Sequence, residues 1–312
     1  MSEDFEIKLM EKLKEKKLAE SSINYYLRNL RKLNDDKEIK NLSFLANKEK
    51  INKFIESKKP NTQRNYYITI VSVLGTDDKK KALKTYYTNY MDKMNKDLKE
   101  KESKNEKSET QKKNWMDQEN INKIYNNLKE SVDKFKNEKE ISDNKYDTLI
   151  KYVILSLYTL VPPRRNKDYL KCFMVKNTPE KELDEDYNYI DLTNKQFIFN
   201  NFKTKKKEGQ KKIDIPDDLM NVLKIYEKFH PLIDGNEKKY EVPLLVKYDG
   251  EPYEADNSIT YILNSIFHKK IGSSMLRHIY LSSKYGDTIK EQEKDSNFMS
   301  HSLETQKVYV KK

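Results

Sequence analysis

Apolar side chains recur every three or four residues through the first hundred positions, which predicts a series of amphipathic helices. The first two helices are marked by Phe5, Leu9, Leu13, Leu18, Ile23, Tyr26, Leu27 and Leu30. Asn47 is placed to cap a third helix, and Pro60 opens a fourth that runs to Gly75. A fifth helix is predicted from Asp77 to about Lys99. Residues 1–100 are therefore predicted to form one compact helical domain.

Residues 101–113 contain no apolar side chain, so they are predicted to form a polar linker outside any core. A helical pattern resumes at Trp115 and continues through Leu128. A strongly apolar helix is predicted over residues 146–160. The second domain is accordingly expected over residues 114–312.

Between Tyr187 and Ile215 the apolar spacing changes from helical to alternating. Aromatic and β-branched residues within 187–192, 196–200 and 211–215 predict a small antiparallel sheet. A further helix is predicted to begin at the proline that follows. The chain is thus expected to be mainly α with a small antiparallel β-sheet, an α+β fold.

Composition adds a basic charge balance. The chain carries 62 Lys and Arg against 51 Asp and Glu, a formal net charge of +11. This excess favours a polyanionic partner, with binding that weakens as salt rises. Basic residues recur on the predicted N-terminal helices, where Arg28, Arg31 and Arg64 are candidates for contacts to DNA phosphates. The alternative for each of them is a solvated surface position.

Several other classes of protein are disfavoured. The single cysteine, Cys172, excludes an internal disulfide framework, and no Cys/His spacing is typical of a zinc site. No apolar run approaches the ~20 residues of a membrane span, and the N-terminus lacks the order of a secretory signal. These features predict an intracellular protein that does not span a membrane.

Two arginines follow the prolines that end the apolar helix. The prolines at 162 and 163 stop that helix, since neither can donate a backbone hydrogen bond. Arg164 and Arg165 come next, where guanidinium groups can hold a phosphate bidentately. Asp168 lies one helical turn after Arg165 and is expected to orient its guanidinium. A surface Arg–Asp pair is the alternative interpretation.

The last quarter of the chain contains Arg277, His301 and Tyr309 in that order. A tyrosine that attacks a DNA phosphate needs cationic and hydrogen-bonding groups around that phosphate, and these residue types supply them. The predicted last turn of the sheet is rich in lysine and can enter a groove, the alternative being a charge-blunted sheet edge. Its lysines are Lys203, Lys205, Lys206 and Lys207.

On these residues the chain resembles the tyrosine recombinases, the phage-integrase family, over essentially its whole length. Residues 1–100 resemble that family's core DNA-binding domain, and the second domain resembles its catalytic domain. The family's arginine followed three residues later by an acid matches Arg165 and Asp168, with Arg164 as the competing register. Its hairpin lysine matches Lys203, with Lys205 as the alternate.

The C-terminal part of the resemblance contains two departures, Ser274 and a separation of eight residues between His301 and Tyr309 where nine is common. The family's second arginine box matches Arg277, but Ser274 stands where a histidine or lysine is usual. The family's later histidine matches His301, and its nucleophile matches Tyr309. Because a serine hydroxyl is a poor base at neutral pH, the substitution leaves the route of the tyrosine proton open.

The resemblance implies a site-specific recombinase or integrase, from a virus or mobile element, that cleaves and rejoins DNA through a 3′-phosphotyrosyl intermediate. Arg165 and Arg277 would clamp the scissile phosphate, and Lys203 would protonate the departing 5′-oxygen. His301 would hydrogen-bond the phosphate or assist proton movement. The covalent link to Tyr309 preserves the phosphodiester energy, so neither a nucleotide cofactor nor a metal ion is expected.

The expected partner is double-stranded DNA bound by a homo-tetramer on paired sites, with a monomer or weak oligomer when free. If the protein is viral, the expected location is the host nucleus or a cytoplasmic virus factory. Two other functions stay open. One is DNA relaxation of the type IB topoisomerase kind, which needs the same cleavage without partner exchange. The other is a DNA-binding protein that has lost catalysis.

Overall fold

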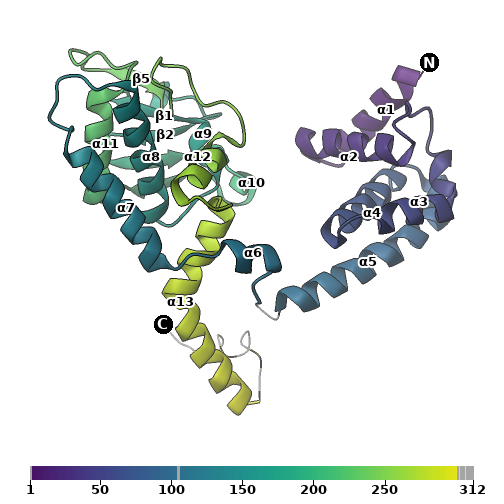
Figure 1. The fold of residues 1–312 in the computed structure, drawn as a ribbon. Coiled ribbons are helices and arrows are strands. Elements are labelled where there is room, and N and C mark those ends of the chain that lie inside the picture. Colours follow the sequence, from purple (N-terminus) through teal and green to yellow (C-terminus); the bar gives the residue numbers. More distant parts are fainter. Residues whose placement is uncertain (1, 104–105, 301, 303–305, 307–312) are drawn as a thin grey trace. The chain divides into compact units, whose positions relative to one another are not determined.

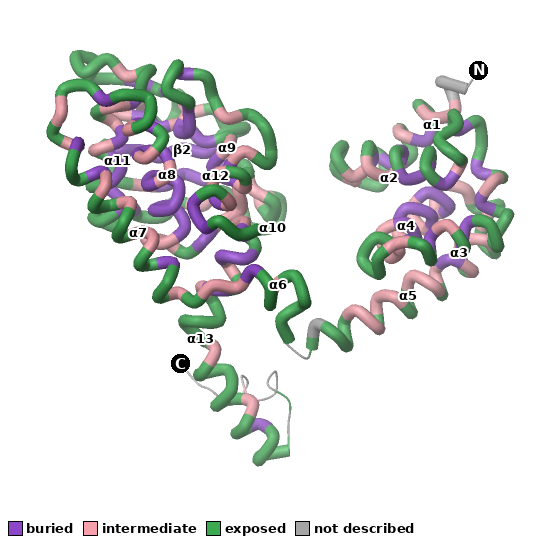
Figure 2. The backbone as a smooth tube through the Cα atoms, viewed as in Figure 1, coloured by how far each residue is buried: buried purple, intermediate pink, exposed green. Residues whose placement is uncertain are grey.

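The computed structural model describes residues 2–103, 106–300, 302 and 306, and it divides the chain into two compact units, residues 1–107 and 108–312 (Figure 1). Each unit has an apolar core of its own. Buried residues are concentrated inside each unit, and most residues toward its outside are exposed (Figure 2).

The first unit is helical, as the apolar spacing predicts. It consists of α1 (Ser2–Glu15), α2 (Glu20–Leu33), α3 (Lys48–Glu56), α4 (Pro60–Leu74) and α5 (Lys81–Ser103), with short 3-10 turns at Ser43–Ala46 and Asp78–Lys80. The predicted cap of α3 is confirmed, because the Asn47 side chain accepts a hydrogen bond from the Lys50 amide. Pro60 occupies the first turn of α4, also as predicted.

Part of the predicted polar linker is helical. Helix α5 continues to Ser103, and a further helix, α6 (Glu109–Asn114), precedes the second domain's predicted start. A capping box forms the start of α6, since the Ser108 side chain accepts from the Gln111 amide while the Gln111 side chain accepts from the Ser108 amide. Asn114 at its end is buried and accepts from the Lys270 amide at 3.0 Å, so α6 packs with the second unit.

The second unit combines helices with one small sheet. Its helices are α7 (Gln118–Asp133), α8 (Asp143–Thr159), α9 (Asn166–Leu170), α10 (Lys205–Glu208), α11 (Asp217–Phe229), α12 (Ser258–Phe267) and α13 (Ser273–Phe298), with a 3-10 turn at Glu180–Glu182. Its strands are β1 (Cys172–Lys176), β2 (Asn188–Asp191), β3 (Gln196–Phe199), β4 (Lys211–Asp214) and β5 (Tyr240–Pro243). The mainly-α α+β fold class predicted from the sequence is confirmed.

The sheet itself corrects one prediction, because it is mixed and not antiparallel throughout. Its strands run in the order β4-β3-β2-β1-β5, and β1 lies parallel to β2 while the other neighbouring pairs are antiparallel. The sequence analysis located β2, β3 and β4 but did not predict β1 and β5. Strand β1 is buried on both faces, so its residues do not alternate.

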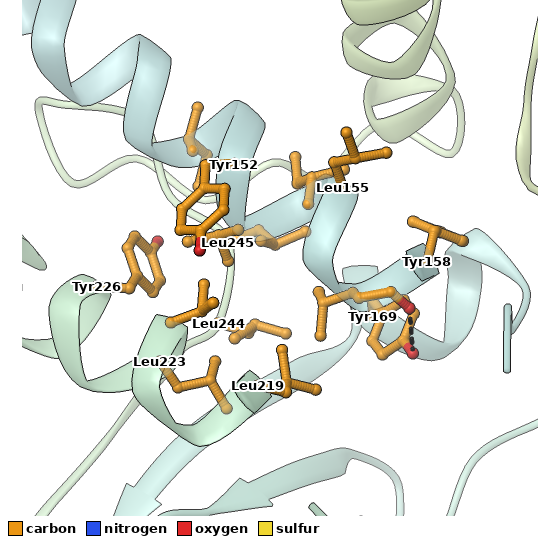
Figure 3. Packing of buried hydrophobic residues seen from close by; sticks show 14 of the residues in the cluster. Tyr152, Leu155, Tyr158, Tyr169, Leu219, Leu223, Tyr226, Leu244 and Leu245 are labelled. Atoms are coloured by element: carbon orange, nitrogen blue, oxygen red, sulfur yellow. Dashed lines mark hydrogen bonds between the residues drawn. The ribbon is translucent and has the colours of Figure 1, made fainter. Parts of the chain in front are cut away.

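Helix α8 forms the centre of the second core. Its residues from Tyr146 to Tyr158 are almost all buried, and it packs against α7, α11 and α12. Figure 3 shows Tyr152 and Leu155 of α8 close to Leu223 and Tyr226 of α11 and to the chain at Leu244 and Leu245. The end of such a fully packed helix is fixed in space, which makes it a firm support for the residues that follow.

His230 joins the end of α11 to β5 in the neutral form. It is only 3% exposed, and its Nε2 lies 3.0 Å from the carbonyl oxygen of Pro243, which can only accept a hydrogen bond. Its Nδ1 accepts a hydrogen bond from the Leu232 amide at 3.3 Å. Burial lowers the pKa of His230 to about 4, so the ring stays neutral near pH 7.

This histidine predicts a stability loss in mild acid. The unfolded chain takes up a proton near pH 6.5 while the folded chain does so only near pH 4, so the unfolding free energy falls as the pH drops through this window. Between pH 7 and pH 5 the loss assigned to His230 is about 2 kcal/mol. Urea unfolding followed by Trp115 fluorescence measures it in the second unit. The fall of the unfolding free energy with decreasing pH should be smaller in His230→Gln but unchanged in the matched control His278→Gln, whose residue is exposed. An equal fall in the native chain and both variants would contradict the assignment.

Candidate anion site

The end of α8 places two arginines at the start of the candidate site. Leu160 caps α8, and the two prolines that follow, of which Pro163 is buried, prevent the helix from continuing. The chain is extended at Arg165, the residue that precedes α9. Arg164 and Arg165 are thus held on a short, stiff connection between α8 and α9.

Arg164 is held on two sides. Its Cζ lies 3.6 Å from the ring centroid of Phe199, a buried residue of β3, so the planar guanidinium stacks on that ring. Its Nε donates a hydrogen bond to Oδ2 of Asp168 at 2.9 Å. Within the part of the chain that the structure describes, Asp168 is the side chain that Arg164 hydrogen-bonds. The two terminal nitrogens of Arg164 are therefore available to hydrogen-bond a ligand.

The partner of Asp168 corrects the sequence prediction. Asp168 was expected to orient Arg165, but its carboxylate accepts a hydrogen bond from Arg164. Arg164 packs on Phe199, and in this position its Nε reaches the Asp168 carboxylate in the first turn of α9. The Asp168 side chain is 4% exposed. Burial raises the pKa of Asp168, and the Arg164 guanidinium opposes this rise. A buried carboxylate of this kind is stable only with its cation in place.

Arg165 and Arg277 join Arg164 around one pocket of about 350 Å³. Arg277 comes from the second turn of α13, far from Arg165 in the sequence, and its Nε donates to the Ser273 carbonyl at 3.3 Å. The positive charges of Arg165 and Arg277 also oppose the rise in the pKa of the Asp168 carboxyl. The residues that line the pocket are Pro163, Arg164, Arg165, Asp168, Phe202, Thr204, Glu208, Lys211, Ile213 and Arg277.

The hairpin between β3 and β4 forms the other wall of the pocket. Lys203 is exposed and lies between two lining residues, Phe202 and Thr204. The alternate lysine, Lys205, turns toward Glu185, with its Nζ 3.3 Å from the Glu185 carbonyl oxygen. The remaining two predicted loop lysines, Lys206 and Lys207, are exposed positions of α10.

Lys211 is a lining residue that the sequence analysis missed. It begins β4 directly opposite Phe199, the residue on which Arg164 stacks. Its Nζ lies 3.3 Å from Oε2 of Glu208, and this contact together with a hydrogen bond from Thr204 lowers the pKa of Glu208. The strand register that brings Lys211 to the pocket follows from the length of the loop, which the sequence pattern does not encode.

The lining charges give the pocket its chemistry. Arg164, Arg165, Arg277 and Lys211 supply four cations, and Asp168 and Glu208 supply two carboxylates. Asp168 is paired with Arg164 and Glu208 with Lys211, so Arg165 and Arg277 give the pocket its excess of positive charge. A site with guanidinium groups from separate segments fits the oxygens of a phosphate group.

One further predicted residue lies apart from the pocket lining, and two lie outside the described residues. Ser274 lies in the first turn of α13 and is exposed, outside the residues that line the pocket. His301 and Tyr309 lie outside the described residues. The arginines Arg165 and Arg277, in contrast, are brought together.

The predicted DNA contacts of the first unit have partners within that unit. Arg31 forms an ion pair with Glu6, and Arg64 donates a hydrogen bond to the side chain of Asn95. The Arg28 guanidinium lies 5.3 Å from the ring centroid of Tyr25.

A larger cavity of about 570 Å³ lies in the first unit, but its chemistry is different. It is bordered by α1, by residues 41–43 and by residues 76–80. The lysines in its lining, Lys8, Lys12 and Lys80, are matched by Glu11, Glu15 and Asp77. Balanced charge of this kind does not select an anion, so the smaller pocket at Arg164 is the better candidate site.

No protein-family model matches the chain, and no curated protein or solved structure matches it either. Among the described residues, every helix is too short or too polar to span a bilayer. The same residues contain no group of three or more His, Cys, Asp or Glu side chains arranged to hold a metal ion.

The pocket predicts measurable binding of a small phosphate compound. Replacing Arg277 with Gln removes one charge-assisted contact, so the affinity for inorganic pyrophosphate should fall about tenfold, measured by titration calorimetry. Lys167→Gln is the matched control, because Lys167 is exposed on α9 and pairs with Asp256 outside the pocket lining. It should stay within about twofold of the native chain. An equal loss in both variants would show that only net charge matters.

Proposed function

We propose that this chain is a DNA strand transferase of the tyrosine-recombinase kind, a site-specific recombinase or integrase. The observation that carries the proposal is the convergence of Arg164, Arg165 and Arg277 on one pocket beside a lysine-bearing hairpin. Arginines at these places, followed by Tyr309 near the end of the sequence, are the residue types that phosphodiester cleavage by a tyrosine needs.

The arginines would act on the charge that develops during the reaction. When a phenolic oxygen attacks the phosphorus in line with the departing 5′-oxygen, negative charge grows on the two non-bridging oxygens. Arg277, with Arg165 or Arg164, would bind these oxygens. Because Asp168 and Phe199 already fix the Arg164 guanidinium, little reorganisation would be needed at the moment of attack.

Two proton transfers complete the reaction. The Tyr309 phenol gives its proton to His301 or to solvent as its oxygen forms the bond to phosphorus. The bond between phosphorus and the 5′-oxygen breaks in the same step, and the departing oxygen gains a proton. Lys203 on the hairpin loop and Lys211 at the start of β4 are the candidate proton donors to the 5′-oxygen. His301 would hydrogen-bond the phosphate. Rejoining reverses these steps with a 5′-hydroxyl from a second strand.

The basic helical unit of residues 1–107 would supply further DNA contacts, and a homo-tetramer would hold two duplexes for exchange. Neither a nucleotide cofactor nor a metal ion takes part in the proposed steps. The nearest alternative, relaxation of supercoiled DNA, uses the same cleavage without the second duplex.

Covalent trapping tests the proposal. The full chain is incubated with a pool of nicked suicide duplexes whose sequence around the nick is randomised, and adducts are detected on a denaturing gel. Tyr309→Phe should abolish the adduct because it removes the nucleophilic oxygen. Tyr261→Phe is the matched control, since Tyr261 is an exposed tyrosine on α12 and should leave the adduct unchanged. An adduct that persists in Tyr309→Phe rules out the proposed nucleophile.

Sequencing the trapped duplexes then supplies a substrate for the second step. Joining of strands from two different duplexes supports recombination, while relaxation of a plasmid without joining supports the topoisomerase alternative. Salt-sensitive DNA binding without any adduct would identify a DNA-binding protein that has lost catalysis.

Ser274 provides a separate prediction. If the serine merely occupies the position of the usual histidine or lysine, Ser274→His should leave the single-turnover cleavage rate equal to or above that of the native chain, because imidazole is the better base near neutral pH. Ser274 is exposed, so the larger ring meets no packed core. Quenched-flow measurement gives the rate. A fall of about tenfold or more would assign the serine a role of its own.

A further inference from the structure

Asn188, the first residue of β2, lies beneath the candidate site, and its side chain is completely buried. Its Nδ2 donates to the Asp168 carbonyl at 2.9 Å and to the Asn201 carbonyl at 2.9 Å. Its Oδ1 accepts from the Asn200 amide at 2.9 Å and from the Asn201 amide at 2.8 Å. A carboxamide has two donors and two acceptor positions, so Asn188 uses its full capacity.

These four hydrogen bonds join the two walls of the pocket. The Asp168 carbonyl belongs to α9, whose first turn fixes Arg164. Asn200 and Asn201 begin the hairpin loop, which carries the lining residues Phe202, Thr204 and Glu208. No other described side chain hydrogen-bonds both the α9 backbone and this loop.

The rest of the loop depends on this anchor. Its two ends are joined where Gln210 donates to the Asn200 side chain at 2.7 Å. Asn188 pairs with Phe199 in the sheet register, so the same strand position supports the ring on which Arg164 stacks. A shift of the Asn188 amide would therefore move the loop relative to the guanidinium of Arg164.

We propose that Asn188 is a positioning residue that sets the distance between the hairpin loop and the Arg164 segment, and so the fit of the pocket to a phosphodiester. The catalytic part of this inference rests on the proposed function, whereas the anion-binding part does not. Residues of this kind matter because a displacement of about 1 Å can cost a hundredfold in rate.

Asp191 offers a matched control on the same strand. It is buried at the other end of β2, and its Oδ1 accepts from the Thr193 and Asn194 amides. Replacing either Asn188 or Asp191 with Ala thus strips two backbone amides of a buried acceptor. Only Asn188 touches the two walls of the pocket.

The experiment compares Asn188→Ala, Asn188→Ser and Asp191→Ala in the full chain. Three quantities are measured: pyrophosphate affinity by calorimetry, hydrogen exchange of residues 200–210, and single-turnover cleavage of the trapped duplex. In Asn188→Ala we expect affinity to fall about tenfold, loop exchange to rise about tenfold, and cleavage to fall about a hundredfold. Asp191→Ala should stay within about twofold of the native chain in all three, despite a comparable loss of stability.

Asn188→Ser retains one hydroxyl and should give intermediate values, and it replaces Asn188→Ala if that variant does not fold. Equal losses in the Asn188 and Asp191 variants would overturn the inference, since they would reveal a purely structural role. Unchanged affinity and loop exchange in Asn188→Ala would overturn it as well. If the native chain cleaves no DNA, the proposed function fails, but affinity and loop exchange still decide the role of Asn188.

Discussion

Like-charge repulsion is the constraint on which the candidate site depends. Arg164, Arg165 and Arg277 share one pocket with Lys211, and four cations that line one pocket oppose one another, although Lys211 is paired with Glu208. The fold offsets part of that repulsion with the buried Asp168 carboxylate and the face of the Phe199 ring. Removing one partner of such a buried pair typically costs about 3–5 kcal/mol, so the arrangement is retained only as a unit. An anion in the pocket would supply the remaining compensation.

The support for this charge cluster comes from the core. Helix α8 is buried along most of its length, and the prolines after it direct the chain into the arginines. Arg277 enters from α13, whose residues Met275, Leu276 and Ile279 are buried against the same core. Both segments that carry the arginines are therefore anchored by apolar packing immediately next to the charged residues. The apolar core fixes the positions, and the polar groups set the orientation.

Much of the fold could be predicted from sequence where one residue pattern determines one structure. The N-terminal helices, the Asn47 cap and the Pro60 start follow from local rules, and the structure confirms them. The helix at the end of the polar linker was not predicted, because the Ser108–Gln111 capping box stabilises a helix without any apolar residue. Strand β1 was missed because a strand buried on both faces does not alternate, and β5 was missed although it alternates, because four residues far from the other predicted strands give a weak signal.

The site was predictable in its residue types and less so in its contacts. Arg165 and Arg277 were chosen from the sequence, and the fold brings them to one pocket. The partner of Asp168 could not be read from spacing, because helical intervals allow both arginines and the stacking on Phe199 decides between them. The roles of Lys211 and Asn188 depend on strand register and loop closure, which are properties of the folded hairpin.

The charged residues on the two walls of the pocket differ in how much they contribute to the stability of the fold. On the wall formed by Arg164, Asp168 and Phe199, the charges are buried or stacked, so a change there alters stability and anion binding together. On the hairpin wall, Lys203, Glu208 and Lys211 are at least partly exposed, and charges of this kind contribute little to folding. The hairpin can therefore change its charge at small structural cost, while a change in the arginine wall also alters folding. Asn188 hydrogen-bonds both walls and so connects them physically.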